Sequence, residues 1–261
     1  MTKNDTRRAI SALLLSAGVL AAIAPLVAVQ AGPLDWISGG KRVEGSGKIV
    51  KQNRQVSNFH QVAIGISGDV DIRTGGTEGV TVETDDNVLP LIETVVENGT
   101  LHIRTVKNNM HFNTRHMRVL VQVRSLDTVS VGGSGNVTAD QLRGERVTVD
   151  VGGSGSFNVQ SVQAPSVEIS LGGSGNLKAA GGNAEHLQVS IGGSGNVQVG
   201  RLAARDVNVS IGGSGQATVA ASKSLNVSVA GSGDVGYYGD PQVSKSMMGS
   251  GTVKRLGGSP Q

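Results

Sequence analysis

Closely spaced carboxylates are the first residues in this sequence that could do chemistry. Asp69 and Asp71 alternate along one short run, so both side chains lie on one face of a strand and could together bind a cation. Asp85 and Asp86 are adjacent, so their side chains point apart, and we expect them to cap a turn. The acids of the second half are scattered over different positions of a repeat: Asp140, Glu145, Asp150, Glu168, Glu185 and Asp206.

The histidines and the lack of cysteine limit metal and nucleophile chemistry. His111 and His116 lie beside Arg115 in a polar stretch, residues 107–118, that we expect to be an exposed basic loop. Two histidines without a third ligand do not predict a metal site. The chain has no cysteine, which excludes thiolate ligands, disulfides and lipid attachment at cysteine. No Ser-His-Asp order is recognisable, so we predict no catalytic residue, no cofactor and no metal site.

A regularly spaced set of serines instead belongs to a repeated Gly-Gly-Ser-Gly motif. Each full copy begins 20 residues after the previous one, and two shortened Gly-Ser-Gly copies follow at steps of 18. A fixed period of this length is typical of a stacked repeat, in which each unit buries its apolar face against its neighbours. The full copies occupy residues 132–135, 152–155, 172–175, 192–195 and 212–215, and the short ones 231–233 and 249–251.

Apolar residues alternate with polar ones on both sides of each motif, and the phase continues through the glycines. The unit around Leu187 to Val199 shows this pattern, which has the period of a β-strand. Two strands per unit, joined by a glycine corner, predict an all-β fold: a β-solenoid, specifically a right-handed parallel β-helix with coils of about 20 residues. The position where a calcium-binding roll needs aspartate is apolar here, as at Val137 and Leu177.

Polar residues recur at fixed outward positions of the repeat and form a candidate recognition ladder. Aligned amides and hydroxyls can hydrogen bond between coils and stiffen the corners. The same ladder could instead present a flat face to a polysaccharide or an envelope protein, and the sequence leaves both roles open. The candidate residues are Asn136, Asn176, Asn196 and Gln216, with Ser134, Ser154, Ser174, Ser194 and Ser214 beside them.

The first half of the chain predicts a less regular β portion that could close one end of the stack. Short alternating runs begin near Val56, and Asn98-Gly99 predicts a hairpin that pairs residues 94–97 with 100–105. Residues 32–55 contain several glycines and charges, and we expect a flexible lead-in there.

Residues 1–31 resemble an export signal. Three basic residues precede a long apolar run that ends in Val29-Gln30-Ala31, a small-residue cleavage site. We therefore expect an exported protein in the periplasm, at the cell surface or secreted, without a stable transmembrane span after cleavage; retention of the segment as an anchor is the alternative. The chain has a net charge of +3. Residues 1–31 hold three basic residues and one acid, so the rest of the chain has a net charge of +1. This balance does not favour nucleic acid as a partner.

Several motifs occur in a fixed order along the chain: Phe59-x-x-Val62, Ser67-Gly68-Asp69-Val70, Val80-Thr81-Val82-Glu83-Thr84-Asp85-Asp86-Asn87, Asn98-Gly99-Thr100-Leu101-His102-Ile103 and the recurrent Gly-Ser-Gly-x-Val. Together they resemble a known family, the putative auto-transporter adhesin, head GIN domain. The resemblance covers residues 56–253, with the regular repeats at 129–253 and a tail at 254–261. It implies a β-helical, exported bacterial protein and supplies no catalytic motif.

These observations predict a non-enzymatic, adhesin-like or envelope interaction module. The expected partner is a cell-surface polysaccharide or an envelope protein. The alternative is a carbohydrate-active β-helix enzyme of the lyase or hydrolase type, which would need carboxylates gathered in one groove after folding. Homo-oligomerisation through the end coils is a further expectation, because an uncapped solenoid exposes strand edges.

Overall fold

The computed structural model of the chain describes residues 42–107 and 110–260, which belong to one compact unit, Gly39–Gln261. Almost all of its elements are strands, and the single helical element in the described ranges is a 3-10 helix, η1 (Leu89–Leu91). Nowhere in these ranges is there a helix long and apolar enough to cross a membrane. The predicted export signal, residues 1–31, lies outside the described residues.

The strands, in chain order, are β1 (Arg42–Glu44), β2 (Ile49–Arg54), β3 (Gln61–Ile64), β4 (Asp69–Thr74), β5 (Gly79–Asp85), β6 (Ile92–Glu97), β7 (Thr100–Thr105), β8 (His111–Asn113), β9 (Met117–Val123), β10 (Thr128–Val131), β11 (Asn136–Arg143), β12 (Arg146–Gly153), β13 (Ser156–Gln163), β14 (Ser166–Gly173), β15 (Asn176–Ala179), β16 (Gly182–Gly193), β17 (Asn196–Gly213), β18 (Gln216–Gly231), β19 (Asp234–Tyr238), β20 (Gln242–Gly249) and β21 (Thr252–Gly257).

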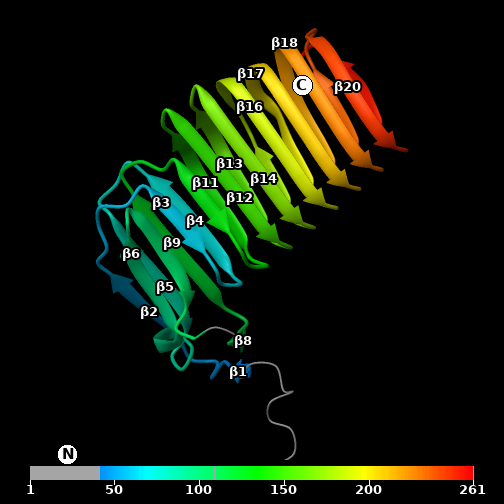
Figure 1. The fold of residues 1–261 in the computed structure, drawn as a ribbon. Coiled ribbons are helices and arrows are strands. Elements are labelled where there is room, and N and C mark those ends of the chain that lie inside the picture. The colour runs from blue at the N-terminus through cyan, green and yellow to red at the C-terminus, as the bar shows by residue number, and fades with distance from the viewer. Residues whose placement is uncertain (1–41, 108–109, 261) are drawn as a thin grey trace, which may run out of the picture. The chain divides into compact units, whose positions relative to one another are not determined.

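These strands build two faces around one core (Figure 1). Face A runs through β6, β7, β3, β10, β12 and β14, the later parts of β16, β17 and β18, and β20. Face B runs through β2, β5, β9, β4, β11, β13 and β15, the first parts of β17 and β18, then β19 and β21. The long strands bend from one face to the other between coils.

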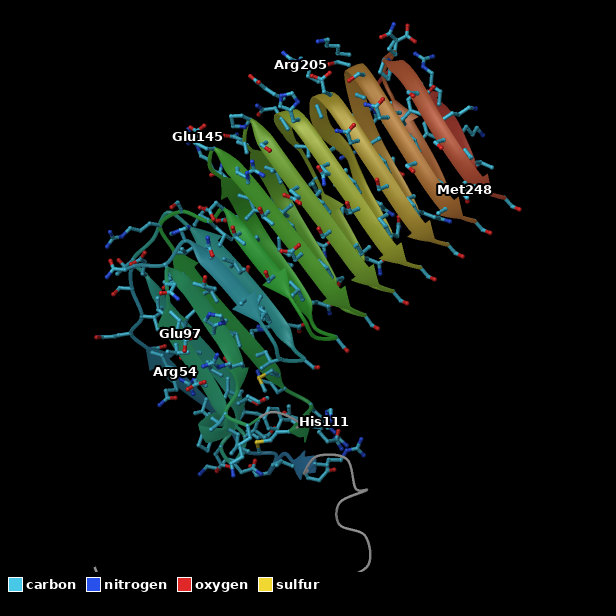
Figure 2. The ribbon with its side chains drawn as sticks, viewed as in Figure 1. Arg54, Glu97, His111, Glu145, Arg205 and Met248 are labelled. Atoms are coloured by element: carbon cyan, nitrogen blue, oxygen red, sulfur yellow. The ribbon has the colours of Figure 1, made fainter. Side chains whose placement is uncertain are left out.

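The repeat forms the predicted β-solenoid of stacked parallel coils. Residues one repeat apart pair in register, so Val149 pairs with Ile169, and Val189 with Val209. These columns are at most 3% exposed and fill the space between the faces with aliphatic side chains. Polar side chains line the outside of the coils (Figure 2). The sequence period therefore corresponds to one full coil.

The second and third glycines of each motif make the corner. Gly173 has φ +124, and a Cβ there would lie 2.5 Å from the carbonyl oxygen of Gly153 in the coil before it. A Cβ added at Gly175 would be equally close, 2.5 Å from the oxygen of Gly155. Backbone bonds such as Ser174 N–H to Gly153 O, at 3.1 Å, join the corners of successive coils. Only glycine allows the chain to turn this tightly between coils.

The first half is also solenoidal, although the chain visits its coils out of order. β3 and β4 form a coil that pairs on one side with β10 and β11, the next regular coil. On the other side it pairs with β7 and β9, again in parallel. Residues between β4 and β10 therefore build the coil beneath and then return. Because neighbouring coils are not consecutive in the sequence here, this half of the chain shows no fixed period.

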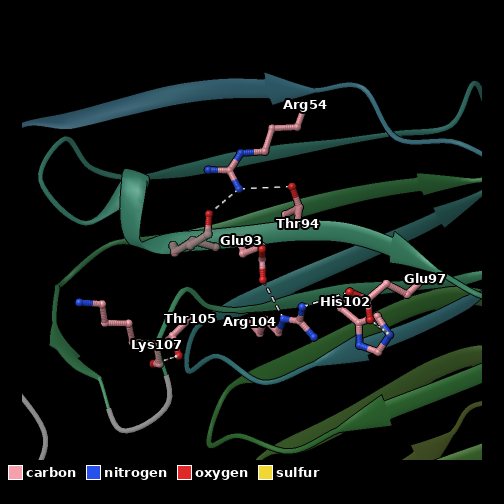
Figure 3. A network of polar contacts seen from close by, with 9 residues as sticks. Arg54, Glu93, Thr94, Glu97, His102, Arg104, Thr105 and Lys107 are labelled. Carbon is pink, nitrogen blue, oxygen red and sulfur yellow. Dashed lines mark hydrogen bonds and ion pairs between the residues drawn. The ribbon is translucent and has the colours of Figure 1, made fainter.

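Antiparallel strands close this end of the stack. β6 and β7 form the predicted hairpin, with Asn98 and Gly99 at φ 51° and 78°. β5 pairs antiparallel with β9, and β2 pairs antiparallel with β5. From β2, Arg54 reaches across to face A and donates hydrogen bonds to the carbonyls of Ile92 (2.7 Å) and Leu89 (3.1 Å). It also donates to Thr94 Oγ1 at 3.3 Å (Figure 3). The end of the core is thus covered by a guanidinium that is bonded to the backbone of the opposite face.

The prediction of a flexible lead-in over residues 32–55 is wrong for its described part. Residues from 42 onward form β1, which pairs with β8, and β2. The turn between them is held by the acidic pair that the sequence places at a turn: Gly47 N–H donates to Asp85 Oδ1 at 2.6 Å and Ser46 Oγ to Asp86 Oδ1 at 2.6 Å. Local composition could not show this order, because the acidic residues that hold the turn lie about 40 residues further along the chain.

Candidate functional site

The outer surface of face B is hollowed where β2, β5, β9, β4 and β11 lie next to one another. The hollow has a volume of about 560 Å³ and lies over the end of the molecule that the antiparallel strands close. Its lining combines charged, amide and hydroxyl groups with apolar surface. The lining residues are Lys51, Asp69, Val70, Asp71, Arg73, Thr81, Glu83, Arg118, Leu120, Asn136 and Thr138.

One row of cross-strand neighbours supplies most of the charged groups. Lys51 on β2 pairs with Glu83 on β5, and Glu83 pairs with Arg118 on β9. Arg118 in turn pairs with Asp69 on β4, and Asp69 with Asn136 on β11. Because residues directly opposite on adjacent strands share a face, all five side chains emerge on the same side of the sheet. Basic and acidic residues alternate along this row.

Each carboxylate of the hollow already has a partner. Asp71 Oδ2 accepts two bonds from Arg73, at 3.0 Å from Nε and 2.9 Å from Nη2. Glu83 Oε1 lies 2.7 Å from His116 Nε2. Asp69 Oδ1 accepts a longer bond, 3.3 Å, from the amide of Asn136. The acids are therefore held in place, with lone pairs left to accept further bonds.

Two of the three cations have no partner. Within the described part of the chain, neither Lys51 nor Arg118 takes part in a hydrogen bond or an ion pair through its side chain, and both are exposed. Arg73 is the third cation, and it is occupied by Asp71. The hollow thus offers unused donors on β2 and β9.

The predicted recognition ladder is aligned across the coils and leads into this hollow. Asn136, Asn176, Asn196 and Gln216 occupy one outward row of face B, with Ser156 between the first two. Ser156 Oγ donates to Asn136 Oδ1 at 2.6 Å. The corner serines form a second, exposed row beside them: Ser134, Ser154, Ser174, Ser194 and Ser214. Of the predicted ladder, Asn136 is the member that lines the hollow.

A shallow groove runs along face A over the first glycines of successive motifs. Its floor is the first glycine of each motif, and a Cβ added at Gly152, Gly172 or Gly192 would meet nothing within 4 Å. Ser190 and Ser210 lie beside this floor in one row. Glycine is therefore not required there by the fold, in contrast to the second and third glycines of the motif.

The other candidates from the sequence are separated by the fold. Asp69 and Asp71 do share a face, as expected, but Asp71 is bonded to Arg73. His111 lies exposed on β8, whereas His116 contacts Glu83. In the described ranges, no three His, Asp or Glu side chains gather in a way that could hold a metal ion.

Lys51, Glu83 and Arg118 cannot be found from the sequence because no local pattern joins them. They lie more than 30 residues apart and meet only through the two antiparallel pairings of β5. The available signal is alternation: Arg118 stands between the buried residues Met117 and Val119, which indicates an outward position. Sequence patterns can identify such a residue as exposed, but they do not identify its cross-strand neighbours.

Comparison with known proteins gives a family and a set of solved structures. A family model described as putative auto-transporter adhesin, head GIN domain, matches residues 58–241. A putative adhesin from Bacteroides fragilis NCTC 9343 is 26% identical, with a TM-score of 0.76, over 82% of this chain and 100% of its own. A putative lipid binding protein from Parabacteroides distasonis ATCC 8503 is 23% identical, with a TM-score of 0.67, over 83% and 100%; that likeness shows the fold alone. No match is found among curated proteins.

Proposed function

Because the chain belongs to the family described as putative auto-transporter adhesin, head GIN domain, we propose that it is a non-enzymatic, adhesin-like module that binds a glycan of a cell envelope or surface. The observation that supports this proposal is the polar hollow on face B. Its carboxylates, amide and hydroxyls can exchange hydrogen bonds with sugar hydroxyls, and Leu120 offers an apolar contact for a sugar ring.

The ladder extends the same surface in a way that suits a polymer. From Asn136 the row of amides and hydroxyls continues over successive coils, about 4.8 Å apart. A linear chain that entered the hollow could follow this row. The corner serines would lie alongside it. This arrangement supports a polysaccharide over a small isolated sugar.

Export is part of the proposal. The family description refers to an adhesin, and residues 1–31 have the composition of a cleavable signal. N-terminal sequencing of the protein from the periplasm and the culture medium tests both the cleavage and the compartment. A mature protein beginning near Gly32 is expected. Recovery of the intact chain in the membrane fraction would favour a retained anchor.

Glycan binding is tested with an array of envelope polysaccharides and the purified full chain. Asn136→Ala should weaken binding, because its amide lines the hollow. Asn226→Ala is the matched control: Asn226 is also an outward amide bonded to the neighbouring coil, at 3.0 Å to Asn208, but on face A. Loss of binding in both variants, or in neither, would contradict a site in the hollow.

A carbohydrate-active enzyme is the alternative because three carboxylates line the same hollow. A turnover assay on uronic-acid polymers separates the two functions. We expect binding without turnover. Turnover that disappears in Asp71→Asn or Glu83→Gln would overturn the binding-module proposal and establish an enzyme.

A further inference from the structure

The hollow contains more hydrogen-bond donors than a neutral ligand would use. Lys51 contributes three N–H donors and Arg118 five, and within the described chain none of them is engaged. A free guanidinium fork matches the geometry of a carboxylate, to which it can donate two parallel bonds. The unused donors therefore indicate a ligand with an anionic group.

Internal acids do not occupy these cations. Glu83 lies between them in the row, but its carboxylate is bonded to His116 at 2.7 Å. Asp69 is turned to the Asn136 amide. Lys51 and Arg118 stand two strands apart, about 10 Å at the usual strand spacing, so their long side chains can converge on one group above Glu83.

The other carboxylates of the hollow indicate which further groups the ligand carries. Asp69 keeps lone pairs that can accept from hydroxyl groups, and Asp71 keeps acceptor capacity on Oδ1, to which the Thr138 hydroxyl already donates at 3.2 Å. A ligand that satisfies both sets must carry hydroxyls and an anion on the same unit. A simple anion would leave the acidic acceptors unused, and a neutral sugar would leave the cations unused.

We propose that the hollow is specific for acidic glycans, with Arg118 binding the carboxylate of a uronic-acid unit and Lys51 assisting it. This inference rests on the proposed glycan-binding function and specifies its ligand class. Asp69 and Asp71 accept hydrogen bonds from hydroxyls of the same or the adjacent sugar. The Asn136 row then guides the polymer along the coils.

The experiment compares oligogalacturonate with its methyl ester, which has the same backbone without the charge, by calorimetry on the full chain. The acidic form should bind at least about tenfold more tightly, since hydrogen bonds to charged groups are the stronger ones. Its affinity should fall as salt is raised, because exposed charges are screened. A sulfated oligosaccharide is tested in parallel; preference for it would support an acidic ligand and overturn the assignment to a uronic-acid carboxylate.

Arg118→Gln should lower the affinity for oligogalacturonate about tenfold and leave the methyl ester unaffected. Lys51→Gln should have a smaller effect in the same direction. Lys254→Gln is the matched control, since Lys254 is an exposed lysine on β21 of the same face, far along the stack. Neither hollow variant should lose thermal stability, because these side chains have no partners in the described chain.

The outcomes distinguish this inference from the function beneath it. Equal binding of the acid and its methyl ester, unchanged in Arg118→Gln, would overturn acidic specificity and leave glycan binding intact. Absence of binding to every glycan, charged or neutral, would overturn both.

Discussion

Neighbouring glycines in one corner have different structural roles, and this can be measured at a single pair. Gly193 has φ +140, and a Cβ added there would overlap the backbone oxygen of Gly173. Gly193→Ala should therefore cost about 3 kcal/mol of unfolding free energy, from combined backbone strain and clash. At Gly192 an added Cβ meets nothing, so Gly192→Ala should change stability by no more than about 0.5 kcal/mol. Urea denaturation of both variants checks this; equal effects would contradict it.

A second residue-scale prediction concerns Asp206 on β17. The Ser224 hydroxyl donates to Asp206 Oδ1 at 2.6 Å and Arg205 Nε to Oδ2 at 2.9 Å, which lowers the pKa of the Asp206 carboxyl. A pKa lower in the folded than in the unfolded state stabilises the protein above the unfolded pKa, and this is lost as pH falls through the folded pKa. Ser224→Ala should raise the pKa of Asp206 toward its ordinary value, as followed by carboxyl NMR. An unchanged pKa would show that the serine is not the main cause.

At the scale of elements, Arg54 on β2 should contribute more to the free energy of unfolding than an exposed arginine does. It satisfies the carbonyls of Ile92 and Leu89 at the closed end, and burial lowers its pKa. Arg54→Ala leaves these acceptors without their donor and should cost about 1–3 kcal/mol in thermal or urea unfolding. Arg124→Ala, whose side chain is 75% exposed and lies 3.9 Å from Glu78, should cost less than about 1 kcal/mol. Similar losses in the two variants would refute the role of Arg54 at this end.

Elements also explain what the sequence could predict. The regular coils were predictable because each residue of the core meets its equivalent one period away, as Val189 meets Val209. The hollow was not, because Lys51 and Arg118 reach it through antiparallel pairings between segments of unrelated pattern. Asn136 could be identified from the sequence because it belongs to the regular repeat and also lines the hollow. It is the last amide of the regular row before the irregular strands. Short-range periodicity shows which face of a strand is buried. A site formed by strands that are distant in the sequence can be found only when the strand pairing is known.

At the scale of the whole molecule, the two ends differ. Antiparallel strands and Arg54 close one end, whereas at the other no described strand pairs with the outer edges of β20 and β21. Open edges of this kind favour stacking of copies. On β20, Val243 is 40% exposed and Met248 is 77% exposed. Met248 is labelled in Figure 2. The expected homo-oligomerisation would have to use this end.

Charges at core positions of the last coil should prevent such stacking. Lys245 pairs in register with Val227 and Arg255 with Tyr237, so both continue inward columns of the stack. A second copy placed on this end would bury these cations against its own Lys245 and Arg255, or against the end that holds Arg54. Arg255 donates to Gly239 O at 2.7 Å and lies 3.9 Å from Asp240, whereas Lys245 has no such partner in the described chain. Burying a charge without a partner is strongly unfavourable. We therefore predict that the chain stays monomeric at moderate concentration and that Lys245→Val combined with Arg255→Val promotes end-to-end association. Light scattering across a concentration series measures this, with the outward Lys254→Val as the control for lost charge. A monomeric double variant, or a wild-type chain that already associates through this end, would show that these cations do not prevent association there.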